Sequence, residues 1–142
     1  MMHDEHVPHR DSQFGDCYRK AAFNGLLPGY VNFLKERQVN EWDSCVDGSS
    51  VLSAYGIRDC AVDFDFLNIK TEKFGEIFPL DHHNVAWSQL GFDIKDVIYN
   101  PKNFFYFKNV KFASLAQTRA FKAKQGRERD IKDVELIDEL TR

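Results

Sequence analysis

Hydrophobic and polar residues alternate along several short stretches of this chain, which is the pattern of β-strands with one buried face. In residues 61–67 the apolar side chains occupy one face, whereas Asp63 and Asp65 occupy the other. A short apolar run that leads into Gly48 predicts a buried strand. The predicted strands are residues 44–46, 61–67, 94–99, 104–107 and 110–113, and the last two form a tight hairpin.

Helical spacing and capping residues predict helices in the first half of the chain. Residues 16–38 form a helical region, which we expect to be interrupted near Leu27-Pro28-Gly29 because proline lacks a backbone donor. A second, two-turn helix begins where Ser49 or Ser50 can cap it. It ends at Gly56, since glycine readily adopts the left-handed conformation that stops a helix.

The last third of the chain is predicted to be helical. Ser114 and Gln117 have the spacing of a capping box, and Gly126 ends the helix that they begin. Asp130, followed by Asp133, opens the final helix. The apolar side chains of this helix fall on a single face, which consists of Ile131, Val134, Ile137 and Leu140.

The order of these elements predicts the fold class. A helix, a strand, a helix, a set of mostly antiparallel strands and two final helices make an α+β domain with a small mixed sheet flanked by helices. The 142 residues suffice for one domain with a single core. We assign residues 14–142 to this domain and residues 1–13, which are polar, to a flexible N-terminal arm.

Composition narrows the classes of partner. The net charge of −3 gives no electrostatic reason to expect a long nucleic acid as partner. No apolar run approaches about 18 residues, so we expect no membrane partner. The three cysteines are widely spaced and form no Cys-x-x-Cys pair, which favours a reducing, cytoplasmic location.

The strand with two aspartates is the strongest candidate for chemistry. Asp63 and Asp65 lie about 7 Å apart on one strand face and repel each other unless a cation separates them. Hard carboxylate oxygens favour Mg²⁺ or Mn²⁺. The Gly48-Ser49 turn, one short helix upstream, can offer backbone N–H groups to a phosphate. A metal next to a phosphate indicates phosphoryl or nucleotidyl transfer, whereas the alternative is a solvated acidic strand face.

These residues resemble a known signature. Gly48-Ser49 followed by Asp63-Phe64-Asp65 is similar to the Gly-Ser…Asp-x-Asp motif of the nucleotidyltransferase superfamily, whose fold is shared with DNA polymerase beta. The segment between them, residues 52–59, looks closest to small members associated with polysaccharide biosynthesis. The resemblance therefore implies a nucleotidyltransferase-like sheet.

A second resemblance is independent of the first. Residues 110–115 and 122–133 are similar to the strand, helix, basic turn and Asp-x-x-Asp that end minimal nucleotidyltransferases. Together the two matches cover roughly residues 43–140. In that family the paired aspartates hold Mg²⁺, so the resemblance assigns both metal binding and catalysis to Asp63 and Asp65.

The resemblance also implies a third carboxylate on a neighbouring strand. Asp96 is the best candidate, although it shares its predicted strand face with Ile94 and Ile98 and equally suits a strand edge.

For phosphate binding the resemblance implies Gly48 and Ser49. Arg58 is added because it sits between the phosphate turn and the metal strand. Lys122 belongs to a basic group around the turn before the last helix, completed by Lys124, Arg127 and Arg129. This group is either a phosphate clamp or a solvated helix end that favours cations.

The implied function is Mg²⁺-dependent (or Mn²⁺-dependent) transfer of a nucleotidyl or phosphoryl-linked group from a nucleoside triphosphate to a small acceptor, such as a sugar. One alternative is a catalytically degenerate module that only binds. Another is suggested by Asp81-His82-His83, which looks like the Asp-His-His motif of a Mn²⁺ phosphoesterase family. That family is much longer and carries its Asp-x-Asp far upstream, and a polar loop explains the histidines equally well.

Overall fold

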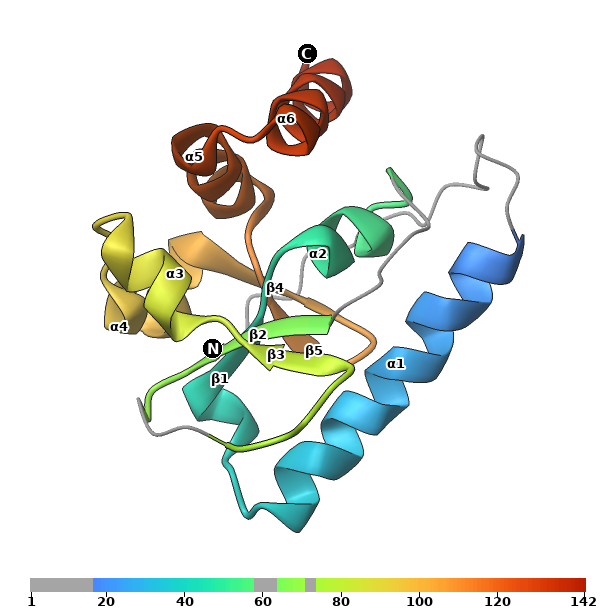
Figure 1. Cartoon of the computed structure of the whole chain (residues 1–142), viewed down its shortest axis with the longest axis vertical. Coiled ribbons are helices and arrows are strands. Elements are labelled where there is room, and N and C mark those ends of the chain that lie inside the picture. The colour runs from blue at the N-terminus through green and yellow to red at the C-terminus, as the bar shows by residue number, and fades with distance from the viewer. Residues whose placement is uncertain (1–16, 58–63, 71–73) are drawn as a thin grey trace.

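The computed structural model describes residues 17–57, 64–70 and 74–142, with side chains from Phe23 onward in the first helix. The predicted N-terminal arm, Arg58 and Asp63 lie outside the described residues. Within the described part, five strands form one mixed sheet in the order β3-β2-β1-β5-β4 (Figure 1). They are β1 Ser44–Val46, β2 Phe64–Asn68, β3 Leu80–His82, β4 Phe104–Phe107 and β5 Val110–Ala113.

The strand directions confirm a mixed sheet flanked by helices. β1 runs antiparallel to β2 and parallel to β5, β2 runs parallel to β3, and β4 and β5 are antiparallel. The β4–β5 hairpin was predicted correctly, because Lys108 and Asn109 both adopt positive φ, as a two-residue turn of this kind requires. The helices are α1 Cys17–Glu36, α2 Ser49–Ala54, α3 Asn84–Gln89, α4 Ile94–Tyr99, α5 Leu115–Gln125 and α6 Glu128–Thr141, with 3-10 turns at Glu41–Asp43 and Pro101–Asn103.

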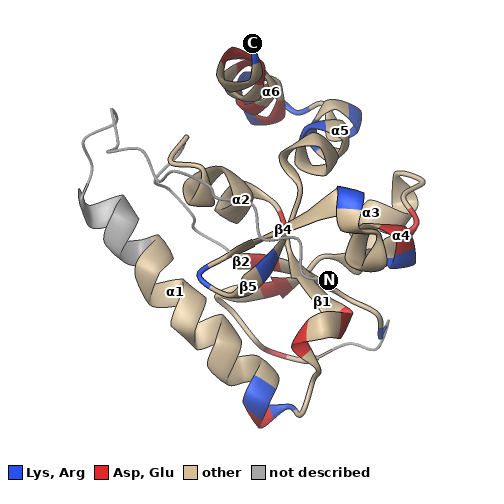
Figure 2. Ribbon diagram, turned by 180° about the vertical axis from the view of Figure 1, so that it is seen from behind, with Lys and Arg blue, Asp and Glu red and all other residues tan. Residues whose placement is uncertain are grey.

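Helix α1 lies along one face of the sheet, on the side opposite α3 and α4 (Figures 1 and 2). The ring of Tyr30 lies 5.2 Å from that of Phe64 and 5.6 Å from that of Phe66. The predicted interruption near Pro28 is wrong, since the helix continues through this residue. Burial of one apolar face outweighs the lost backbone donor, and this face consists of Phe23, Leu27, Tyr30 and Leu34.

The predicted strand at 94–99 is wrong, because these residues form α4. The side chain of Asp93 accepts a hydrogen bond from the backbone N–H of Lys95 and caps the helix. Val97 and Ile98 are buried, while Ile94 packs at the edge of the core, so the apolar residues follow helical spacing. The alternation in the sequence reflected only part of this pattern.

Helix α5 confirms its predicted ends. Ser114 Oγ accepts a hydrogen bond from the N–H of Gln117, and Gly126 adopts φ +67° after the last turn. Helix α6 differs from prediction in two respects. It begins at Glu128, so Asp130 lies inside its first turn rather than opening it. In addition, Ile131 is 53% exposed whereas Ile137 is buried. The buried side of α6 instead carries Asp130 and Asp133 (neither is more than 2% exposed), which places two carboxylates against α5.

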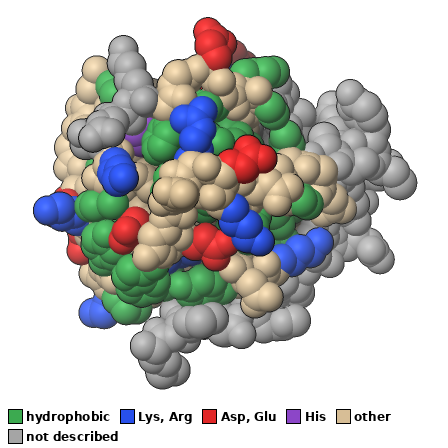
Figure 3. Space-filling view, turned by 90° about the horizontal axis from the view of Figure 1, so that it is seen from below, with side chains coloured by type: hydrophobic (Ala, Val, Ile, Leu, Met, Phe, Trp, Pro, Cys, Tyr) green, Lys and Arg blue, Asp and Glu red, His purple; other side chains and the backbone are tan. Residues whose placement is uncertain are grey.

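None of the described helices combines the length and the apolar character that crossing a membrane demands. Basic and acidic side chains are interspersed with hydrophobic ones on the face shown in Figure 3. Figure 2 shows basic and acidic positions next to one another where α5 turns into α6. The absence of a long nucleic-acid partner stays a prediction from the charge of the chain.

Candidate metal centre

Three side chains from three different sheet elements meet on the sheet. Asp47 directly follows β1, and its backbone N–H donates to the carbonyl of Asp65 in β2 (N···O 2.9 Å). His83 directly follows β3, and its N–H donates to the carbonyl of Phe66 (2.8 Å). One potential ligand atom from each of Asp47, Asp65 and His83 lies within 4.8 Å of the others. This is the group among the described residues that can hold a metal ion.

The carboxylate of Asp47 is fully buried and only half satisfied. Its Oδ1 lies 2.8 Å from Nδ1 of His83. Its Oδ2 is also buried, and within the described part of the chain no hydrogen-bond partner reaches it. A buried carboxylate oxygen without a partner is costly, because nothing replaces the water that it loses on folding. The orphaned oxygen therefore points to a positively charged ligand beside His83.

The electrostatics of His83 reflect the same carboxylates. Burial lowers its pKa, but the charge and hydrogen bond of Asp47, followed by the charge of Asp65, outweigh burial and raise the pKa to about 9. The imidazolium is thus the countercharge of the acidic pair when no other cation is bound. A metal ion that replaces this countercharge displaces the proton.

A stacked pair of aromatic rings from α3 and α5 lies on one side of the histidine. The ring of Phe121 lies 5.3 Å from that of His83, and Trp87 stacks on Phe121 with a centroid distance of 4.5 Å. These rings exclude water from one side of the cluster. Charge interactions at Asp47 and His83 are therefore stronger than they would be in solvent.

The Gly48 turn lies directly against the cluster. Gly48 has φ +72° and ψ −148°, a region open essentially only to glycine, and a Cβ built on it would clash with Oδ2 of Asp65. Gly48 itself is the N-cap of α2, so the predicted cap by Ser49 or Ser50 is wrong. Phosphate binding by Gly48 and Ser49 stays a prediction.

We expect the substitution Gly48→Ala to destabilise the fold by about 1–3 kcal/mol, because its backbone conformation strains any side chain. The new methyl group would also force the Asp65 carboxylate to move, so metal binding should weaken as well. Urea unfolding and calorimetric titration with Mn²⁺ measure the two effects. Gly29→Ala is the matched control, since Gly29 is exposed in α1 with open space at its Cβ. Equal effects of the two variants would contradict this role of Gly48.

Asp65 is half-buried on β2, on the face opposite Phe64 and Phe66, as the alternation predicted. Its expected partner Asp63 lies outside the described residues. Asp96 is not on a neighbouring strand, which corrects the prediction, because it is exposed in the first turn of α4. There its carboxylate accepts hydrogen bonds from the amides of Asn100 and Asn103. Among the residues that the structure describes, the carboxylate that joins Asp65 is that of Asp47.

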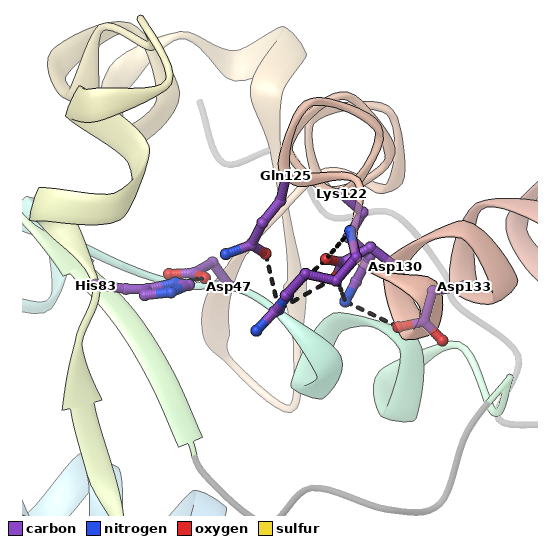
Figure 4. A network of polar contacts seen from close by, with 7 residues as sticks. Asp47, His83, Lys122, Gln125, Asp130 and Asp133 are labelled. Carbon is purple, nitrogen blue, oxygen red and sulfur yellow. Dashed lines mark hydrogen bonds and ion pairs between the residues drawn. The ribbon is translucent and has the colours of Figure 1, made fainter.

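Lys122 is buried rather than open to solvent. Its Nζ lies 2.9 Å from Asp133 Oδ2 and 3.8 Å from Asp130 Oδ1, and its side chain is 6% exposed. Figure 4 shows Lys122 extending from α5 toward these two aspartates of α6. Because its ammonium group is held between two carboxylates, Lys122 is placed to link two helices.

Asp47 was missed as a ligand, and the role of His83 was left open. Asp47 carries one weak signal, which is its place between a buried strand and the Gly48-Ser49 turn. His82, the other histidine of the Asp-His-His motif, lies elsewhere, since its ring packs against Phe66 (5.4 Å) and Phe74 (4.9 Å). Of the two histidines, only His83 joins the cluster.

Comparison of the chain with protein-family models, curated proteins and solved structures finds no match in any of the three.

Proposed function

We propose that this chain is a nucleotidyltransferase-like enzyme that uses Mg²⁺ or Mn²⁺ to transfer a nucleotidyl or related phosphoryl-linked group from a nucleoside triphosphate to a small acceptor, such as a sugar. The observation that carries the proposal is the buried, half-satisfied carboxylate of Asp47 beside Asp65 and His83. The order of strand, Gly48-Ser49 turn, short helix and aspartate-bearing strand supports the resemblance to the nucleotidyltransferase fold.

The geometry of the cluster suits a small divalent cation. Two ligands in neighbouring positions around such an ion, each at about 2.1 Å, lie about 3 Å apart. The potential ligand atoms of Asp47, Asp65 and His83 lie within 4.8 Å of one another, and the 2.8 Å between Asp47 Oδ1 and His83 Nδ1 is a hydrogen bond that a bound ion would replace. Carboxylates suit both Mg²⁺ and Mn²⁺, and an imidazole ligand favours Mn²⁺.

The side chains have separate roles in this proposal. Asp47 and Asp65 supply the negative charge that holds the cation. The ring of Phe121 limits the access of water to His83 from one side. When bound, the cation would neutralise charge on the triphosphate and orient it for in-line attack. Gly48 leaves the space beside Asp65 free of a side chain.

The decisive experiment measures pyrophosphate release. The chain is incubated with each labelled nucleoside triphosphate, with Mg²⁺ or Mn²⁺, and with a panel of sugars, proteins and tRNA. We expect metal-dependent release with a small acceptor, reduced at least about 100-fold in Asp47→Asn because a ligand mutation removes the cation. Asp93→Asn is the control, since Asp93 is an exposed helix cap and asparagine caps equally well.

Other outcomes identify other functions. Release only with tRNA would contradict the small acceptor. Nucleotide binding without release under any condition would contradict catalysis and support a degenerate nucleotidyltransferase fold that acts as a binding module. Hydrolysis of a phosphoester without transfer would favour the phosphoesterase alternative.

A further inference from the structure

Arg127 lies at the turn between α5 and α6. Among the described residues, the Nε and Nη2 atoms of its guanidinium group donate hydrogen bonds, whereas Nη1 donates none. Nε donates to Asp130 Oδ2 (2.7 Å) and Nη2 donates to Asp130 Oδ1 (3.3 Å). Nη2 also donates to Oε1 of Gln125 (2.8 Å). The side chain is 46% exposed. The group is thus rigidly oriented and still has two N–H donors available.

A buried ionic network fixes this orientation. Asp130 is fully buried, and it accepts from the backbone N–H of Arg127 (3.1 Å) as well as from its side chain. Lys122 lies between Asp130 and Asp133 and carries a compensating positive charge. Burial raises the pKa of Asp130, but its hydrogen bonds with Arg127 and the charge of Lys122 outweigh burial and lower it. Asp130 therefore stays ionised as the anchor of Arg127.

Gln125 relates Arg127 to the metal cluster, because its side-chain oxygen accepts a hydrogen bond from the guanidinium group. In Figure 4 the amide of Gln125, which contacts Arg127, lies between the Asp47–His83 pair and the Lys122–Asp130 network. The hydrogen bond to Asp130 is the main cause of the raised pKa of Arg127, and Asp65 adds to it. Asp65 is thus near enough to act on the guanidinium electrostatically.

We propose that Arg127 binds the phosphate oxygens of the triphosphate substrate beside the Asp47–Asp65–His83 cluster, and that Asp130 is its positioning residue. This inference rests on the proposed function, because it places the anion next to the cation site. It assigns phosphate binding to Arg127 instead of Lys122, whose ammonium group is buried between two carboxylates.

The chemistry of the two groups supports this assignment. Asp130 and Gln125 accept from Nε and Nη2, so the two N–H groups of Nη1 are the donors that a phosphate oxygen can use. An anchored guanidinium loses little side-chain entropy when the anion binds. The backbone N–H of Arg127 is not available to bind the anion, since it already donates to Asp130.

Two titrations test the inference separately from the proposed function. Calorimetry with Mn²⁺ alone reports the metal site, and calorimetry with ATP or inorganic tripolyphosphate, with and without Mn²⁺, reports the anion site. We expect Arg127→Gln to bind Mn²⁺ like the wild type and to bind ATP and tripolyphosphate about 10- to 100-fold more weakly, the usual range for a lost charged hydrogen bond. Arg127→Lys keeps the charge, but its single nitrogen atom cannot bind Asp130 and the anion in the same fixed orientation, so it should recover only part of the affinity.

The controls separate binding from folding. Lys132→Gln removes an exposed charge from α6 and should leave both titrations unchanged. Asp130→Asn should weaken ATP binding but not Mn²⁺ binding, whereas a purely structural role of Asp130 would weaken both. Wild-type affinity for ATP and tripolyphosphate in Arg127→Gln would overturn the inference.

The titrations also distinguish failure of the proposed metal site from failure of the proposed anion site. If the wild type binds no Mn²⁺, the metal site is wrong, and the metal-free tripolyphosphate titration still decides the role of Arg127. Metal-free binding that depends on Arg127 would support the anion site alone. The absence of both metal and anion binding in the wild type would overturn the inference together with the proposed function.

Discussion

With Mn²⁺ at about 100 times its dissociation constant, the melting temperature of the wild-type chain is expected to rise by about 5–10 °C. A ligand at this excess that binds only the folded state stabilises it by about 2.7 kcal/mol. In a domain of this size each kcal/mol shifts the melting temperature by a few degrees. Asp47→Asn should abolish the rise, because Asp47 contributes the buried carboxylate with an orphaned oxygen.

Scanning calorimetry with Mn²⁺, and again after addition of EDTA, measures this effect. EDTA should return the wild type to its metal-free melting temperature. Asp93→Asn, which changes an exposed carboxylate of the same type, should keep the full rise. A rise in Asp47→Asn as large as in the wild type would show that the ion binds elsewhere.

Local patterns predicted the parts of the fold that depend on near neighbours. The hairpin turn at Lys108-Asn109 and the helix end at Gly126 require positive φ, and Asn109 and Gly126 are residues that adopt it readily. The two faces of β2 follow from alternation alone. Each of these features depends on residues within one turn or one strand.

The errors arose where packing between distant segments decides the structure. Pro28 disfavours a helix interior, yet the apolar face of α1 packs across the sheet and overrides that preference. Residues 94–99 are too few for periodicity to separate a strand from a helix, and the capping role of Asp93 was the missing signal.

The candidate site was only partly predictable for the same reason. Asp47 and His83 are 36 residues apart along the chain, with Asp65 midway, and the three are brought together by the pairing of β1, β2 and β3. Alternation identified Asp65, but no local pattern indicates which strand ends will meet. Lys122 was predicted to bind phosphate or to lie at a solvated helix end, whereas its ammonium group lies between Asp130 and Asp133, which come from the next helix.

The burial of Asp130 and Asp133 makes a large loss of stability the expected result of removing Lys122. Lys122→Ala is expected to lower the free energy of unfolding by about 3–5 kcal/mol, because it leaves the buried carboxylates of Asp130 and Asp133 without their shared ammonium group. Urea unfolding measures the loss. Arg119→Ala is the matched control, since it removes an exposed ion pair with Asp138 between the same two helices, and its effect should be far smaller.

A double-mutant cycle separates charge from packing. Lys122→Met keeps most of the side-chain volume, so a loss similar to that of Lys122→Ala would identify charge as the cause. Combining Lys122→Met with Asp133→Asn removes one carboxylate along with the ammonium group and should recover part of the stability, since matched removal of buried charges is far less costly than removal of one partner. An unchanged urea midpoint in Lys122→Met would mean that the charge of Lys122 contributes nothing measurable to the packing of α5 against α6.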